Sequence, residues 1–295
     1  MSVSQQRIVP LKTVCTLAGV ARSSVYLRKA QVLALRPPAR RGPRGAASDA
    51  ELVTRIRAVL AASPFVGEGY RKVWARLRHQ GLRTSRARVL RLMRAHELLA
   101  PTRLGSPRGP QSHDGTIIPA APDLRWGTDL TGTFTLEDGP VSVLLTVDHC
   151  SAEILGIHAA KRATRFEALE PVRQAVRRSF GRIAQNVAVG LELRHDHGSQ
   201  YLSDDFQTEL AFLGITSSPA FVRAPEGNGC AERAIRTLKE QLLWIRTFRT
   251  VEELRLALLE WAELYNSQWL IERHGFRPPA AVRRDHEATL QKRAA

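Results

Sequence analysis

Residues 191–201 read LELRHDHGSQY, and residues 225–239 read PEGNGCAERAIRTLK. The first run ends its apolar-to-acidic stretch on Asp196 before a glycine turn, which predicts a β-strand with a carboxylate at its end. The second run is rich in turn residues and leads into a helix, with Glu232 in or near the first turns. These two acids are well placed to meet, and oxygen ligands of this kind bind hard divalent cations such as magnesium.

A third acid stands upstream, inside the strand-like run WGTDLT at residues 126–131. Asp129, Asp196 and Glu232 follow one another along the chain, with 35 residues between the last two. Lys239 comes seven residues after Glu232, which is two helical turns, so both side chains project from one helix face. Two acids alone would be a weak signal because acidic residues are common on solvated surfaces. The third acid makes the set a candidate metal site.

With these residues the chain resembles the integrase core of the retroviral integrase superfamily. More narrowly, it is similar to the second-frame transposase of insertion sequences of the IS3 family. The spacing of the acids, the trailing Lys239 and the run NGCAER at residues 228–233 carry the resemblance, which covers nearly the whole chain. The runs GYR at residues 69–71 and RVLRLM at residues 88–93 also match segments of that family.

The fold class expected is an α/β catalytic core of the ribonuclease H-like type, preceded by all-α helix-turn-helix DNA-binding regions. Hydrophobic patterning and turn signals predict strands at 126–135, 141–148, 153–159, 191–196 and 214–217. Helices are predicted after the caps Ser48, Thr164, Ser203 and Thr250, and after the loop that precedes Glu232. The first three strands form an antiparallel meander, and the whole order implies a mixed five-stranded sheet with flanking helices.

Charge divides the chain into two parts. Residues 1–110 hold 22 Lys and Arg against 4 acids, a net charge of +18, whereas the remaining 22 bases and 24 acids give −2. Such an excess at one end indicates a polyanionic partner for that end, namely double-stranded DNA. The domains expected are a first helix-turn-helix (1–35), a basic linker rich in Pro and Gly (36–48), a second helix-turn-helix region (49–100), a second linker (101–123), the integrase catalytic core (124–270) and a C-terminal tail (271–295).

Candidate DNA contacts lie in both helical regions. In the first they are Arg22, Ser23, Ser24 and Tyr26, and in the second Arg71, Arg86, Arg88, Arg91 and Arg94. The buried stripe of the helix after Ser85 leaves its four arginines largely outward. If that helix enters the major groove, Arg86 and Arg88 lie nearest the bases, while Arg91 and Arg94 meet phosphates. The alternative is a helical hairpin that only packs, with arginines that solvate its surface.

The resemblance implies a mechanism in which Asp129, Asp196 and Glu232 hold two Mg²⁺ ions, with Mn²⁺ as a substitute. The ions would activate water, and then a 3′ hydroxyl, against phosphodiesters. Lys239, Arg233 and Arg236 would hold DNA phosphates near the cut. Asp148 is interpreted as a structural acid at the end of a strand. His195 and His197 could contact DNA or shape their loop.

The function expected is that of a DNA transposase that binds the ends of an insertion sequence and integrates them. A DNA-binding regulator would not need three acids at this spacing, and a ribonuclease H-like nuclease without strand transfer would not need two helix-turn-helix candidates. A homo-oligomer on DNA and an upstream-frame protein fused by frameshifting are the other partners expected. The three scattered cysteines and the lack of a membrane span are typical of a protein of the bacterial cytoplasm, acting on chromosomal or plasmid DNA.

Overall fold

The computed structural model describes residues 9–33, 47–101, 118–220 and 228–294. Most of the two predicted linkers and the loop at 221–227 lie outside the described residues. The chain divides into two compact units, residues 1–47 and 48–295. None of the described helices is long and apolar enough to cross a membrane.

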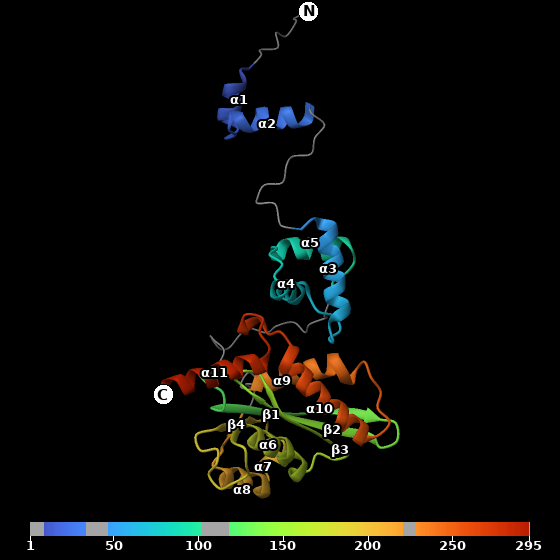
Figure 1. The fold of residues 1–295 in the computed structure, drawn as a ribbon, viewed down its shortest axis with the longest axis vertical. Coiled ribbons are helices and arrows are strands. Elements are labelled where there is room, and N and C mark those ends of the chain that lie inside the picture. Colours follow the sequence, from blue (N-terminus) through green and yellow to red (C-terminus); the bar gives the residue numbers. More distant parts are fainter. Residues whose placement is uncertain (1–8, 34–46, 102–117, 221–227, 295) are drawn as a thin grey trace, which may run out of the picture. The chain divides into compact units, whose positions relative to one another are not determined.

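A five-stranded mixed sheet forms the centre of the second unit (Figure 1). Its strands lie in the order β3-β2-β1-β4-β5. The first three strands are antiparallel neighbours, whereas β4 and β5 run parallel to β1. This is the mixed sheet that the sequence predicts. The bounds are Arg125–Thr135 for β1, Gly139–Asp148 for β2, Ile154–Ala160 for β3, Glu192–His195 for β4 and Thr216–Pro219 for β5.

Helices cover both faces of the sheet (Figure 1). One apolar layer joins the sheet to α6 (Arg165–Phe180), α7 (Ser199–Leu202) and α8 (Asp204–Leu213). The other joins it to α9 (Gly229–Leu238), to η2 (Lys239–Leu243) and to α10 (Val251–Gln268). The chain ends in a short turn, η3 (Glu272–His274), and in α11 (Pro279–Ala294).

Hydroxyl caps begin several helices as predicted. The side chains of Thr164, Thr250 and Ser48 each accept a hydrogen bond from the backbone N–H three residues on. Ser203 precedes α8, but its hydroxyl donates to the Gln200 carbonyl at 3.0 Å and does not cap the helix.

The predicted position of the fifth strand, 214–217, is wrong by two residues. Gly214 has φ +79° and ends α8 in the left-handed conformation, with its N–H bonded to the Ala211 carbonyl. Ile215 then donates to the Leu210 carbonyl. Because these two bonds still belong to the helix end, the strand begins only at Thr216.

Three helices precede the sheet in the second unit: α3 (Asp49–Ala62), α4 (Tyr70–His79) and α5 (Arg86–Ala95). Their shared core is formed by nine buried residues, Leu52, Val53, Ile56, Val59, Val73, Leu77, Val89, Leu92 and Met93. The apolar periodicity read from the sequence is confirmed here. The first unit contains α1 (Leu11–Leu17) and α2 (Arg22–Leu33), separated by Gly19 at φ +60°.

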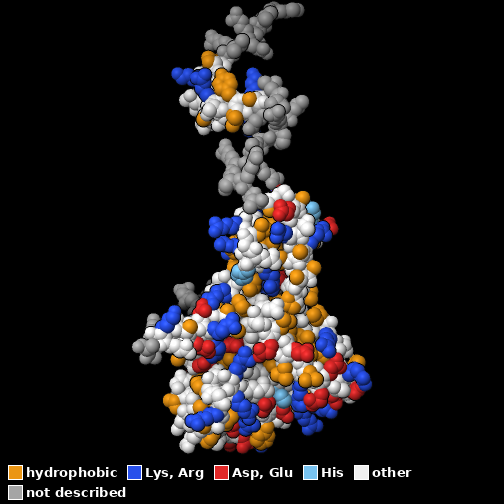
Figure 2. All heavy atoms as spheres, in the orientation of Figure 1, with side chains coloured by type: hydrophobic (Ala, Val, Ile, Leu, Met, Phe, Trp, Pro, Cys, Tyr) orange, Lys and Arg blue, Asp and Glu red, His pale blue; other side chains and the backbone are white. Residues whose placement is uncertain are grey.

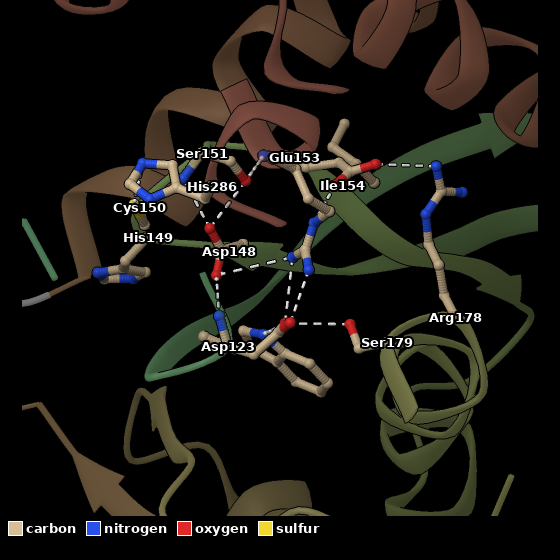
Figure 3. A network of polar contacts seen from close by, with 12 residues as sticks. Asp123, Asp148, His149, Cys150, Ser151, Glu153, Ile154, Arg178, Ser179 and His286 are labelled. Carbon is tan, nitrogen blue, oxygen red and sulfur yellow. Dashed lines mark hydrogen bonds and ion pairs between the residues drawn. The ribbon is translucent and has the colours of Figure 1, made fainter. Parts of the chain in front are cut away.

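A network of buried charges joins α11 to the edge of the sheet (Figure 3). The Arg283 guanidinium contacts three carboxylates: Asp123 at 2.6 Å, Glu153, and Asp148 at 3.8 Å. Asp148 also accepts hydrogen bonds from the Ser151 N–H at 2.6 Å and hydroxyl at 2.8 Å. Asp148 is completely buried, which confirms its interpretation as a structural acid. The helix α11 is therefore packed against the strands of the sheet.

Candidate active site

Asp129 and Asp196 are brought together by two parallel strands. Gly127 in β1 is paired with Arg194 in β4, and each acid follows two residues later along its own segment. Asp129 is half-buried, and its Oδ1 accepts a hydrogen bond from the Leu130 N–H at 2.8 Å. Asp196 is exposed, and its Oδ1 accepts from the Gly198 N–H at 2.8 Å. One oxygen of each carboxylate is therefore fixed by the backbone.

His195 stabilises the loop that carries Asp196 through two polar contacts of its ring. This ring is fully buried, with Nδ1 2.7 Å from the Asp196 carbonyl oxygen and Nε2 2.8 Å from the Ser217 hydroxyl. Of the two roles considered from the sequence, the structure gives His195 the shaping of the loop. His197 points to the surface.

Glu232 is brought to the same place by α9, which packs on β1 and β2. Asn228, one turn earlier, donates from Nδ2 to the Thr128 carbonyl at 3.0 Å, directly beside Asp129. Gly127 leaves room for this clamp, because a Cβ there would lie 2.6 Å from Asn228 Oδ1 and 2.5 Å from His149 Nε2. Sequence reasoning quoted Asn228 and Gly127 within motifs but gave them no role. The sequence did contain a signal for both residues: Asn228 stands one turn before Glu232, and Gly127 stands two residues before Asp129.

The electrostatics of the three acids are coupled. Burial raises the pKa of Asp129 to about 6, and the negative charges of Asp196 and Glu232 act in the same direction. The Leu130 N–H and the Lys239 ammonium oppose this rise in pKa. Partial removal from water also raises the pKa of Glu232. Asp129 thus lies close enough to Asp196, Glu232 and Lys239 for their charges to act on its carboxyl.

Two of the three acids and the lysine border an open cleft of about 590 Å³. Asp129 and Glu232 line it together with Arg236, Lys239, Glu240 and Trp244. Arg236 donates to Glu240 at 3.0 Å, whereas Lys239 forms no ion pair with any described residue. Arg233 is exposed on the same helix. Lys239 therefore shares the cleft with two of the three predicted acids, Asp129 and Glu232.

The donor chemistry of the site fits a hard divalent cation. All three side chains offer carboxylate oxygens, and their mutual repulsion is the kind that a bound cation relieves. In the described part of the chain, no three Asp, Glu, His or Cys side chains already enclose a point where one ion would bind. Because Glu232 is exposed, its carboxylate has room to turn.

The candidate DNA contacts in α5 differ from expectation. Arg88 and Arg91 both bind the Asp49 carboxylate, each at 2.7 Å, and these hydrogen bonds lower the pKa of Asp49 to about 2. The prediction that Arg88 points largely outward is wrong, since its side chain is only 22% exposed. Asp49 belongs to the first turn of α3, so the ion pair fastens α5 to α3.

The other candidate arginines have different surroundings. Arg86 lies over the Trp74 ring at 4.4 Å and near Glu272 at 3.7 Å, and Arg71 forms an ion pair with Glu272 at 2.8 Å. Arg94 is exposed. In the first unit all four candidates on α2 are exposed, namely Arg22, Ser23, Ser24 and Tyr26.

Comparison with known proteins gives matches along most of the chain. Residues 47–104 match an HTH-like domain, and residues 119–225 and 213–279 match two models of the integrase core domain. The chain is 31% identical over 273 residues to the "Putative transposase for insertion sequence element IS986/IS6110" of Mycobacterium tuberculosis (strain CDC 1551 / Oshkosh). That match covers 88% of this chain and 95% of the relative.

Two further similarities span most of the chain. The "Transposase for insertion sequence element IS629" of Shigella sonnei is 27% identical over 233 residues, which is 75% of each protein. Among solved structures, a chain of the simian T-cell lymphotropic virus intasome in complex with PP2A regulatory subunit B56 gamma is similar, with 19% identity and a TM-score of 0.46. That similarity covers 80% of this chain and 74% of the other.

Proposed function

Because the chain belongs to the insertion-sequence transposases with an integrase core domain, we propose that Asp129, Asp196 and Glu232 form its catalytic centre. The reaction proposed is the metal-dependent cleavage of DNA strands at the ends of the element, followed by their transfer to target DNA. The observation that carries the proposal is that Asp129 in β1 and Glu232 in α9 line one cleft, and that Asp196, just after β4, lies near enough for its charge to act on Asp129.

Two Mg²⁺ ions are proposed as the cofactor, with Mn²⁺ as a substitute, held by the three carboxylates. When bound, the ions supply Lewis-acid activation of the attacking oxygen and stabilisation of the leaving oxygen. The protein's own contribution is to fix Asp129 and Asp196 through backbone N–H groups and to hold α9 through Asn228. Lys239 supplies a cation for the phosphate at the same cleft, with Arg233 and Arg236 on the adjoining turns.

No protein nucleophile is needed for this chemistry. Cys230 is the cysteine nearest the acids in sequence, but burial raises the pKa of its thiol, which keeps the thiol protonated. Its Sγ lies 3.8 Å from the Asp148 carbonyl oxygen, on the side of α9 that packs against the sheet.

A cleavage and joining assay on duplexes that carry the element's own ends tests the proposal. We expect nicked ends and joined products with Mg²⁺ or Mn²⁺, and neither with a chelator. Nicking without joining would favour a ribonuclease H-like nuclease, and specific binding without nicking would favour a DNA-binding regulator. We propose that the active species is an oligomer on DNA in the bacterial cytoplasm, and that an upstream reading frame can be fused to it by frameshifting.

The raised pKa of Asp129 predicts an effect on stability that needs no catalysis. A carboxyl whose pKa is higher in the folded than in the unfolded protein destabilises the fold once it is ionised. Without metal, the free energy of unfolding should therefore fall as the pH rises from about 4 through about 6. Asp129→Asn should remove this loss of stability. At pH 7 it should raise the free energy of unfolding by roughly 1–2 kcal/mol and the melting temperature by a few degrees.

Thermal melts with and without Mg²⁺ measure this effect. Mg²⁺ should stabilise the unchanged protein more than the Asp129→Asn variant, because the variant has lost one proposed ligand. Equal stabilisation of both proteins by Mg²⁺ would remove Asp129 from the proposed ligand set.

The distribution of charge predicts where duplex DNA binds. Residues 1–110 carry +18, and positive and negative side chains are interspersed over the catalytic region (Figure 2). A fragment of residues 1–110 should bind duplex DNA by itself, and its affinity should fall steeply with salt. A fragment that starts near Leu124 should bind weakly.

Titrations of both fragments at several salt concentrations give the slope of the logarithm of the binding constant against the logarithm of the salt concentration. Arg94→Ala should weaken binding and lower the slope by about one unit if Arg94 contacts a phosphate. Arg88→Ala should also lower thermal stability, since Arg88 joins α5 to α3 through Asp49. A flat response to salt, or equal affinities of the two fragments, would contradict this assignment of the DNA-binding region.

A further inference from the structure

Trp244 is the one exposed tryptophan among the five in the chain, all of which lie in described segments. Its side chain is 69% exposed, whereas Trp126 and Trp261 are buried. Trp244 lines the cleft that also contains Asp129, Glu232 and Lys239. Leaving a large aromatic ring in water is unfavourable, so its position beside the candidate catalytic acids requires an explanation.

A widened helical turn places this ring at the cleft. After α9 the chain forms the π-helical turn η2, in which the Trp244 N–H donates to the Lys239 carbonyl at 2.9 Å. In a continuous α-helix, residues five apart point in directions about 140° apart. The wider turn brings Trp244 round toward the face of Lys239, and buried Leu243 anchors the turn to the core. Single π-turns within helices often occur at functional sites.

The ring has no aromatic or cationic partner within the described segments. The cleft places charged side chains, Lys239, Arg236 and the carboxylates, beside the ring, together with the apolar Leu130 and Ile235. An apolar protein partner would have to remove these charges from water. A nucleotide suits the same surroundings better, because it offers an anionic phosphate for Lys239 and a flat apolar face for the indole ring.

We propose that Trp244 stacks on a base that leaves the duplex next to the scissile phosphate, and so holds the strand end over the acids. This inference rests on the proposed function of the cleft. A paired base hides its faces in the helical stack, so the ring can reach one only if the base is unpaired. Stacking on an aromatic side chain tolerates any base, which suits a positioning role rather than a sequence-reading role.

Photocrosslinking tests the contact without any chemistry at the phosphate. 5-Iodouracil is placed at each nucleotide flanking the cleavage site of a duplex that carries the element's end. The complex of protein and DNA is then irradiated in the presence of a chelator. We expect a crosslink that mass spectrometry maps to Trp244, that persists in Trp244→Phe and that is lost in Trp244→Leu. Ile245→Ala is the matched control, since Ile245 is a neighbouring exposed apolar residue at 56% exposure.

Cleavage rates provide the second measurement. Trp244→Leu should slow cleavage of fully paired ends by about tenfold, and Trp244→Phe by much less. Ends with mismatched terminal bases should recover most of the lost rate, because the base no longer has to be unpaired. A purely structural role for Trp244 would slow both DNAs equally.

Failure of this inference can be distinguished from failure of the proposed function. An unchanged protein that does not cleave with Mg²⁺ contradicts the function of the acids, while the crosslink still reports on Trp244. No crosslink to Trp244, or equal slowing of paired and mismatched ends, overturns the stacking. A change of oligomeric state in Trp244→Leu, measured by light scattering, would also overturn it by assigning the ring to a protein interface.

Discussion

Asp129→Asn, Asp196→Asn and Glu232→Gln should each lower strand cleavage and joining by on the order of a thousandfold, while duplex DNA binding should stay within about twofold. Each change removes one negative charge from the proposed metal site and keeps the size of the side chain. If the three carboxylates hold the metal ions, losing any one of their charges weakens metal binding. Activation of the attacking oxygen and stabilisation of the leaving oxygen would then both be lost. DNA binding is spared because the basic excess lies in residues 1–110.

The measurement is a single-turnover assay with Mg²⁺, accompanied by binding titrations of each variant. Glu240→Gln is the matched control, because Glu240 lines the same cleft and is paired with Arg236. It should keep activity within about tenfold, since an ion-paired carboxylate contributes at most modestly to the site. Asp148→Asn should lower stability more than chemistry. Near-normal cleavage by any one of the three variants removes that residue from the proposed ligand set.

The grouping of the acids could be predicted because their positions depend on local patterns. Asp129 and Asp196 stand at predicted strands that the fold makes parallel neighbours, and Glu232 stands at the start of a helix with a clear turn before it. The caps Ser48, Thr164 and Thr250 were predictable for the same reason, since each bonds a backbone group three residues away.

Other features depend on contacts between distant residues and escaped prediction. Arg88 finds Asp49 across 39 positions, and Asn228 finds the Thr128 carbonyl across 100. Nothing in the local pattern of residues 239–244 distinguishes a π-helical turn from continued α-helix, so the position of Trp244 at the cleft could not be foreseen. The short helix α7 was missed because its four residues are too few to show a periodicity.

Arg283 is a further feature of this kind, since its segment reads as a C-terminal tail in the sequence. Its side chain is 11% exposed and contacts Asp123, Glu153 and Asp148, of which the last two are almost completely buried. Asp123 lies just before β1, Asp148 ends β2 and Glu153 comes just before β3, so one arginine joins α11 to all three strands. Figure 3 shows the three acids close together. Arg178 also binds Glu153, at 2.9 Å, and Ser151 binds Asp148.

Arg283→Met should therefore destabilise the protein by about 3 kcal/mol, because buried carboxylates lose their shared cation while the methionine only fills its volume. The remaining contacts of Arg178 and Ser151 keep the loss from being larger. For a unit of this size the melting temperature should fall by roughly 10 °C, measured by thermal unfolding.

Arg284→Met, at the exposed neighbouring position of α11, should change the melting temperature by about 1 °C or less. Adding Glu153→Gln to Arg283→Met should restore part of the stability, since one uncompensated buried charge is then removed. Equal melting temperatures of the Arg283 and Arg284 variants would mean that the network does not fasten α11 to the sheet.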